Sequence, residues 1–254
     1  MTAPAAVIRS AANPQLKALR VLAQDSTAWR KEGRAWLEGD HLCRAALARG
    51  VQPLQAVYAE SCPAAQRLPA PSSLVLDDAL FAGLSTLESP ARMGFVIAVP
   101  DPGALAPEAG TVVLDRVQDA GNVGAILRSA AAFGFRQVVA LKGTAALWSP
   151  KVVRAGMGAH FGLVLFDAAE PADLDALRVP LLATSSHGGD LLHQARLPWP
   201  CGWVFGHEGQ GVSSEVEQKS ALRVRIAQPG GEESLNVAAA AAICLHASAA
   251  AVSG

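Results

Sequence analysis

Three segments of the sequence combine glycine with polar residues that could bind a ligand, and each joins the end of an expected strand to the start of an expected helix. In the first, residues 115–128, Gly121 and Gly124 flank Asn122, and Arg128 follows six positions later. A helix that begins near Asn122 would place Arg128 about 9 Å further along its axis. An arginine there can bind a phosphate or stabilise negative charge that develops on an oxygen. The alternative is that Asn122 is a simple helix N-cap and Arg128 a surface residue.

The second segment, residues 205–213, reads FGHEGQGVS. Gly206, Gly209 and Gly211 allow the backbone to approach a ligand closely, and Glu208 lies among them. The spacing matches neither the phosphate loop of nucleotide-binding proteins nor the glycine fingerprint of dinucleotide-binding folds, which also weighs against an ordinary Rossmann-type methyltransferase. A glycine-rich turn with Glu208 on its surface is the alternative.

The third segment, residues 226–236, runs from a strand through a Pro-Gly-Gly turn to a helix expected to begin near Ser234. Ser234 and Asn236 can donate and accept hydrogen bonds at a ligand, and the start of a helix offers free backbone N–H groups. The alternative is that Ser234 is an ordinary helix cap and that Glu232 and Glu233 only complement the helix dipole.

Apolar runs and helical patterns alternate around these loops. Expected strands cover residues 111–115, 138–141, 163–166, 180–185, 203–206 and 223–227, and expected helices cover residues 123–133, 151–159, 172–178, 213–220 and 237–252. Continuous β-branched runs separated by helices predict an α/β fold with a parallel sheet that is covered on both faces. Ligands of such sheets bind at the carboxyl ends of the strands, so the loops after the strands are expected to carry the chemistry.

The N-terminal part of the chain predicts a separate small α/β domain. Its expected elements are a helix over residues 36–50, strands over residues 54–60 and 93–100, and a strand followed by a helix within residues 72–84. The loop over residues 101–110 is rich in proline and glycine, which marks a domain boundary. We therefore expect one domain over residues 1–103 and a second over residues 104–254.

Composition and charge exclude several classes of protein. Hydrophobic residues make up 51% and charged residues 17% of the 254 residues, which excludes wholesale disorder. The net charge of −1 excludes a polycation that coats nucleic acid or membranes indiscriminately. Residues 1–34 nevertheless carry six lysine or arginine residues against two acidic ones, which indicates either a nucleic-acid contact or a solvated basic helix face.

The cysteines and the apolar segments indicate a cytoplasmic protein without a metal site. The four cysteines are widely spaced and form no C-x-x-C pair, as expected for reduced thiols. The N-terminus lacks the basic and apolar pattern of a secretory signal. Residues 237–252 are mostly alanine and include His246 and Ser248, so they predict a buried or interface helix rather than a membrane span.

Taken in order, the three loops resemble motifs of the SpoU (TrmH) family of RNA ribose 2′-O-methyltransferases, within the SPOUT superfamily. The motifs are N-x-G-x-x-x-R at residues 122–128, F-G-x-E-G-x-G at residues 205–211 and E-S-L-N at residues 233–236. The resemblance covers residues 111–254 and continues weakly upstream. There the chain looks like the ribosomal-protein-related substrate-binding domain of members that act on ribosomal RNA. The sequence departs from the family at Ala120, where proline is frequent, and at residues 226–228, where Ile-Ala-Gln replaces Ile-Pro-Met.

The resemblance implies a set of site residues. Those expected around the reacting hydroxyl are Asn122, Arg128, Glu208, Ser234 and Asn236. Those expected to hold S-adenosylmethionine, in part through their backbone, are Thr184, Phe205, Gly206, Gly209, Ile226, Ser234 and Leu235. In the family, the arginine that matches Arg128 is considered the base that activates the hydroxyl, although a guanidinium with a pKa above 12 acts more naturally as a donor.

The resemblance further implies a deep trefoil knot that binds S-adenosylmethionine, a homodimer and an RNA substrate, with ribosomal RNA favoured over transfer RNA. No metal or membrane is expected. Two alternatives stay open besides a transfer-RNA enzyme. One is a non-catalytic RNA-binding or ribosome-assembly factor with the same fold, and the other is a generic nucleotide-binding α/β enzyme.

Overall fold

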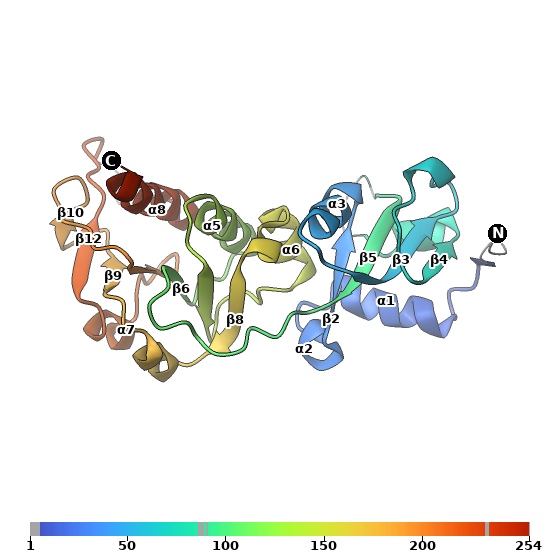
Figure 1. Cartoon of the computed structure of the whole chain (residues 1–254), viewed down its shortest axis with the longest axis horizontal. Helices are drawn as coiled ribbons and strands as arrows, with labels where there is room; N and C mark the ends of the chain where they lie inside the picture. Colours follow the sequence, from blue (N-terminus) through green and yellow to red (C-terminus); the bar gives the residue numbers. More distant parts are fainter. Residues whose placement is uncertain (1–5, 86–88, 90, 232–233, 254) are drawn as a thin grey trace. The chain divides into compact units, whose positions relative to one another are not determined.

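The computed structural model describes residues 6–85, 89, 91–231 and 234–253, and its chain folds into two compact units (Figure 1). Unit 1 comprises Met1–Asp101 together with Trp148–Phe161, and unit 2 comprises Pro102–Leu147 together with Gly162–Gly254. With a domain boundary at residue 103, the segment 148–161 was expected in the second domain. In the structure, this segment belongs to unit 1.

Unit 1 is built on a five-stranded mixed sheet in the order β1-β4-β3-β5-β2. Strand β5 runs antiparallel to both of its neighbours, whereas β1, β4 and β3 are parallel. The strands are β1 (Val7–Ile8), β2 (Arg34–Glu38), β3 (Pro53–Ala59), β4 (Ser73–Leu76) and β5 (Met93–Ala98). The helical elements are α1 (Pro14–Gln24), α2 (Ala28–Glu32), α3 (Asp40–Ala48), η1 (Ala64–Gln66), α4 (Asp78–Ala82) and α6 (Pro150–Gly156), with η2 (Ala159–Gly162) at the end of the inserted segment.

Helix α1 shows how the sequence specifies unit 1. The Asn13 side chain accepts hydrogen bonds from the backbone N–H groups of Gln15 and Leu16, which caps the helix start. Leu16 and Leu19, one turn apart, are buried in the core. This core continues through Trp36 and other apolar residues of the sheet and of α4.

The expected helix over residues 36–50 is wrong in its first part. Trp36 and Leu37 belong to strand β2, and the helix α3 begins only at Asp40. Gly39 separates the two elements with a φ of 98°, a backbone conformation that other residues rarely adopt. This glycine is the signal in the sequence that could have divided the segment into a strand and a helix.

Helix α6 packs within unit 1 although it follows a strand of unit 2. Val152 and Val153 are buried, and a guanidinium nitrogen of Arg154 lies 3.7 Å from a carboxylate oxygen of Glu38 at the end of β2. The Glu38 side chain is only 8% exposed, so its charge has a nearby partner where water is scarce.

Unit 2 contains a seven-stranded sheet in the order β10-β12-β9-β11-β6-β7-β8, and all of its strand pairs are parallel. The strands are β6 (Thr111–Asp115), β7 (Gln137–Leu141), β8 (Val164–Ala169), β9 (Leu181–Thr184), β10 (Asp190–Leu191), β11 (Gly202–Gly206) and β12 (Leu222–Arg225). The helical elements are α5 (Ala120–Ala132), η3 (Pro171–Ala176), α7 (Ser214–Gln218) and α8 (Val237–Ser253). The predicted parallel α/β sheet is confirmed. The expected helix over residues 172–178 is instead the 3-10 helix η3, and β10 was not expected.

Buried strands and the packing of α5 on α8 stabilise unit 2. Every residue of β6, β7 and β11 is buried, which explains their continuous apolar sequences. Helices α5 and α8 lie side by side (Figure 1). The indole N–H of Trp203 in β11 donates to the buried hydroxyl of Ser248 in α8 at 2.8 Å, which joins this helix to the sheet. Within the described part of the chain, α8 included, no helix is long and apolar enough to cross a membrane.

Candidate functional site

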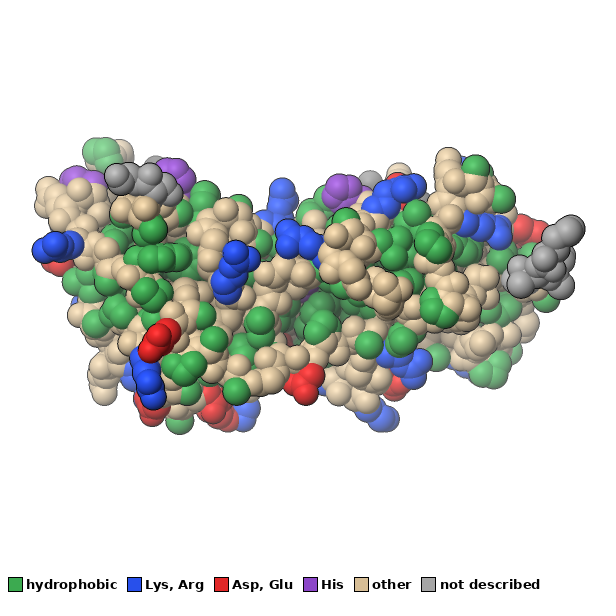
Figure 2. Space-filling model, viewed as in Figure 1, with side chains coloured by type: hydrophobic (Ala, Val, Ile, Leu, Met, Phe, Trp, Pro, Cys, Tyr) green, Lys and Arg blue, Asp and Glu red, His purple; other side chains and the backbone are tan. Residues whose placement is uncertain are grey.

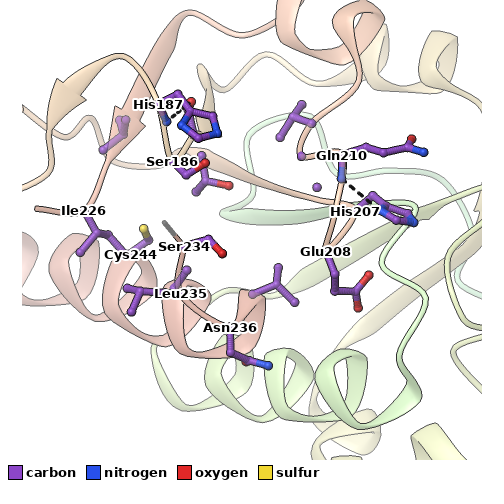
Figure 3. Close-up of a pocket in the computed structure, with 18 of the residues that line it drawn as sticks. Ser186, His187, His207, Glu208, Gln210, Ile226, Ser234, Leu235, Asn236 and Cys244 are labelled. Atoms are coloured by element: carbon purple, nitrogen blue, oxygen red, sulfur yellow. Dashed lines mark hydrogen bonds between the residues drawn. The ribbon is translucent and has the colours of Figure 1, made fainter. Parts of the chain in front are cut away.

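A cavity of about 770 Å³ opens at the carboxyl ends of β9, β11 and β12, next to the start of α8. Figure 3 shows Ile226, Cys244, Ser234 and Leu235 on one side of this cavity and the loop with His207 and Glu208 on the other. Eight of the expected site residues line it: Thr184, Gly206, Glu208, Gly209, Ile226, Ser234, Leu235 and Asn236.

A chain of side-chain hydrogen bonds joins the three motif loops beside the cavity. One Glu208 carboxylate oxygen accepts from the Asn122 side-chain amide at 3.1 Å. The Asn122 carbonyl oxygen in turn accepts from the side-chain amide of Asn236 at 2.9 Å. Residues separated by as many as 114 positions in the sequence therefore form one connected group.

Neither Asn122 nor Ser234 is the helix cap that the sequence offered as an alternative. Helix α5 begins at Ala120, and the side chain of Asp119 caps it by accepting from the backbone N–H of Asn122 at 2.8 Å. At the start of α8, the Asn236 side chain accepts from the backbone N–H groups of Ala238 and Ala239. Asn122 therefore keeps its side chain available for Glu208 and Asn236. Glu232 and Glu233 lie outside the described residues.

The Glu208 carboxylate is held in its charged form. Partial burial raises its pKa, but the hydrogen bonds from the Asn122 side chain and from the backbone N–H groups of Asp119 and Gln118 lower it, and the net pKa lies below the ordinary value. Such a carboxylate is a weak base and a persistent acceptor. Its geometry fits a group that orients Asn122 better than a group that takes up a proton.

The glycine-rich loop over residues 206–211 forms a closed turn with no room for a side chain at its start. A Cβ added to Gly206 would lie 2.1 Å from the backbone of Gly211. The backbones of His207 and Gly211 exchange two hydrogen bonds, and the His207 Nδ1 accepts from the N–H groups of Gly209 and Gln210 (Figure 3). The neutral His207 ring therefore carries its proton on Nε2.

Among the lining residues, Thr184 at the end of β9 donates its hydroxyl to the Val204 carbonyl at 2.9 Å. The other expected residues are not part of the cavity lining. Phe205 is fully buried in β11, so its side chain belongs to the core. Arg128 is exposed on α5, nearly two turns after Asn122, and is not part of the cavity lining. The structure thus connects Asn122 to Glu208 and Asn236 but does not bring Arg128 into this group.

Sequence reasoning missed several residues of this site. Cys244 of α8 lines the cavity, and burial raises the pKa of its thiol to about 12, so it is a neutral part of the wall. His187 and Arg223 also line the cavity. Asp115 and Arg116 contact the glycine-rich loop from the end of β6. Only the position of Asp115 and Arg116 at a strand end could have suggested them. Across the described ranges, no cluster of histidine, cysteine, aspartate or glutamate could hold a metal ion.

The fold and the site together define a class of protein. A parallel α/β sheet with a ligand-sized cavity and three joined polar loops at its strand ends is typical of α/β domains that bind a small molecule. A model of the SpoU rRNA methylase family matches residues 110–246, and the chain belongs to this family.

Individual relatives match over much of the chain. A 23S rRNA (guanosine(2553)-2′-O)-methyltransferase of Bacillus subtilis is 30% identical over 68% of this chain and 70% of its own length. An uncharacterised tRNA/rRNA methyltransferase of Synechocystis is 31% identical over 97% of this chain and 94% of its own length. The crystal structure of an AdoMet-bound rRNA methyltransferase from Sinorhizobium meliloti, 25% identical, covers 98% of each chain with a TM-score of 0.85.

Proposed function

We propose that this protein transfers a methyl group from S-adenosylmethionine to a ribose 2′-hydroxyl of RNA, with ribosomal RNA as the substrate. The observation that carries the proposal is the hydrogen-bonded group Glu208–Asn122–Asn236 at the edge of the cavity. Family membership and relatives whose names describe rRNA methylation support it.

The cavity residues fit S-adenosylmethionine. A volume of about 770 Å³ lies in the range of small-molecule sites. The absence of a side chain at Gly206 lets the loop close on the backbone of Gly211 at one side of the cavity, and Ile226 and Leu235 line the opposite side. Thr184 would lie at the edge of the cofactor, with Gly209 and Ser234 completing its surroundings. When bound, the cofactor supplies a methyl group activated by a sulfonium.

The chain's own residues would align the ribose hydroxyl with that methyl group. Holding two reactants in line can supply on the order of 7 to 11 kcal/mol of the acceleration. Asn122, Asn236 and Ser234 would surround the hydroxyl, and Glu208 would keep the Asn122 amide in a single orientation. Because its pKa is lowered, Glu208 would act by positioning rather than by accepting the hydroxyl proton.

Arg128 would act on the RNA from the exposed face of α5. Its guanidinium would bind a phosphate or stabilise the developing charge on the 2′-oxygen. We expect Arg128→Ala to lower the rate of methyl transfer about 100-fold or more without unfolding the protein. The pH dependence of the rate of Arg128→Lys separates this donor role from the role of a base that takes up the hydroxyl proton, and a rate unaffected by this substitution would contradict both roles.

Residues 1–103, together with the segment 148–161 that packs with them, would form the RNA substrate-binding domain, and the rest of residues 104–254 the methyltransferase domain. Figure 2 shows lysine and arginine side chains dispersed over the visible face of the molecule rather than gathered in one patch. Lysine and arginine side chains that contact phosphates position an RNA without reading its sequence. Transfer RNA is the second candidate, supported by the name of the Synechocystis relative.

The trefoil knot, the homodimer and a cytoplasmic location complete the proposal. The dimer is supported by the surface of α8, where Ala239 and Ile243 are exposed one turn apart on an apolar helix. Small side chains allow helices from two subunits to approach closely. We expect the native mass in light scattering to be twice that of one chain, and Ile243→Glu to weaken this association.

Titration calorimetry with S-adenosylmethionine and S-adenosylhomocysteine tests the function first. We expect micromolar binding at one site per subunit, followed by transfer of labelled methyl groups to ribosomal RNA. The absence of binding at millimolar cofactor in a folded protein would favour a non-catalytic RNA-binding factor. Methylation of transfer RNA alone would favour the second candidate.

A further inference from the structure

Arg116 has an unusual backbone conformation directly after β6. Its φ of 61° lies in the left-handed region, which glycine adopts freely and side-chain-bearing residues rarely adopt. The backbone N–H of Arg116 donates to the Thr144 hydroxyl at 3.0 Å, and that hydroxyl donates to the Leu114 carbonyl. These contacts fix the turn and direct the Arg116 side chain.

The Arg116 guanidinium contacts the C-terminal end of the turn that follows Gly206. Its Nε donates to the carboxylate of Asp115 at 2.9 Å, and its two terminal nitrogens donate to the Gln210 side-chain oxygen at 2.9 Å and to the Gly211 carbonyl at 3.4 Å. The second oxygen of Asp115 accepts from the backbone N–H of Ser213. Asp115 and Arg116 together therefore hold residues 210–213 against the end of β6.

Three features indicate that the contacts of the Arg116 side chain compensate for its strained backbone. Asp115 is almost fully buried, so its charge needs the partner that Arg116 supplies. The planar guanidinium donates in three directions, which a lysine cannot reproduce. A glycine at this position would adopt the left-handed backbone without strain but would make none of these contacts.

We propose that Arg116 is a positioning residue that sets the shape of the loop over residues 206–211 and thereby the cofactor affinity of the cavity. Arg116 itself is not part of the cavity lining, whereas Gly206, Glu208 and Gln210 are. Its effect on the cofactor therefore passes through the loop. This inference rests on the proposed function, because the cavity is taken as the cofactor site.

Calorimetry of S-adenosylhomocysteine binding to the full chain tests the inference with the variant Arg116→Gly. This change removes the guanidinium and relieves the backbone. We expect the Kd to rise about 10-fold or more, because the charge-assisted hydrogen bonds that order the loop are removed. Arg116→Lys is expected to bind nearly as weakly. Arg136→Ala, which removes an exposed arginine at the opposite end of the sheet, is the matched control and should bind like the wild type.

A double-mutant cycle with Gln210→Ala tests whether the effect passes through the loop contact. If it does, the variant that combines Arg116→Gly with Gln210→Ala binds no more weakly than Arg116→Gly alone, because the two changes remove one shared interaction. Fully additive effects on the binding free energy would contradict the proposed route.

The outcomes separate this inference from the proposed function. If the wild type itself does not bind S-adenosylhomocysteine, the proposed function fails. If the wild type binds and Arg116→Gly binds equally well, the inference fails and the function stands. An unchanged Kd with a raised KM for RNA would mean that Arg116 contacts the RNA instead, which overturns the positioning role. Thermal unfolding of each variant shows whether the change is confined to the loop.

Discussion

The two units use sheets of different kinds, and the difference determines where polar side chains can gather. Unit 1 has a mixed sheet in which β5 is antiparallel to its neighbours. Amino and carboxyl ends of strands therefore occur together on each side of this sheet. In unit 2 all strand pairs are parallel, so the carboxyl ends of β6, β9, β11 and β12 meet at one edge. The loops after three of these strands carry the joined group of Glu208, Asn122 and Asn236.

The polar contacts of the two units differ in the same way. In unit 1, Glu38 and Arg154 form an ion pair between a strand and a helix inside the fold. In unit 2, Glu208 and Asn236 lie at a cavity, and the backbone at Gly206, close to Glu208, is tightly constrained. We therefore expect substitutions in unit 2 to change cofactor binding and methyl transfer, and substitutions in unit 1 to change stability or RNA affinity.

Gly206→Ala should have the largest effect. The added Cβ would meet the backbone of Gly211 at 2.1 Å, so the loop must move, and we expect cofactor affinity to fall about 100-fold together with a decrease in stability of about 1–3 kcal/mol. Gly230→Ala is the control in the neighbouring loop, because a Cβ there meets nothing within 4 Å. Equal cofactor binding by both variants in calorimetry would contradict the claim that the loop has no room for a side chain at Gly206.

Asn122→Ala in unit 2 and Asn13→Ala in unit 1 should differ clearly in their effects on the rate of methyl transfer. Asn122→Ala breaks the connection between Glu208 and Asn236 without removing a helix cap, and we expect methyl transfer to fall about 100-fold. Asn13→Ala in unit 1 removes a cap and should cost about 1 kcal/mol of stability while leaving the rate per folded molecule unchanged. Radiolabel transfer and urea unfolding measure both quantities. Equal rates for the two variants would remove the functional contrast between the units.

Lys17→Ala combined with Lys31→Ala tests the RNA-binding role of unit 1. Both lysines are exposed near the N-terminus, and we expect RNA affinity to weaken a few-fold. The slope of log affinity against log salt should become shallower by about 1 for each phosphate that is no longer neutralised. S-adenosylhomocysteine binding should not change. Lys219→Ala in unit 2 is the control, and a salt slope that changes only in this control would show that unit 2 binds the RNA phosphates.

The acid dependence of stability should show the smallest effect. Because the pKa of folded Glu208 lies below its ordinary value, the charged group stabilises the fold above the unfolded-state pKa of about 4.3, and this contribution disappears as the pH falls through the folded pKa. The difference in unfolding free energy between the wild type and Glu208→Gln should be constant near neutral pH and should shrink in acid. A difference that grows as the pH falls would mean that the pKa is raised instead.

The sequence predicted unit 2 better than unit 1 for a physical reason. The fully buried strands of a parallel sheet have continuous apolar sequences that are easily recognised, whereas β2 leads within two residues into α3 and shares its apolar pattern. Sequence spacing also placed Glu208 and Asn236 at strand ends. It could not show that Asn122 connects them, because the hydrogen bonds depend on the packing of α5 against α8.

The backbone of Arg116 illustrates what a sequence does not contain. Arginine is rare with a positive φ, so nothing in the residue type predicts its conformation. The contacts of its side chain with Gln210 and Gly211 depend on a loop that lies 94 and 95 residues further along the chain. The proposed positioning role could therefore be recognised only from the structure.

The membership of Trp148–Phe161 in unit 1 has a consequence for synthesis of the chain on the ribosome. N-terminal domains generally fold first as a chain emerges. Here the buried Val152 and Arg154, the partner of Glu38, are made only after β6, α5 and β7 of unit 2. Unit 1, whose synthesis begins first, thus cannot complete its folding until the segment Pro102–Leu147 of unit 2 has been made. The folding of unit 1 therefore overlaps with the synthesis of unit 2.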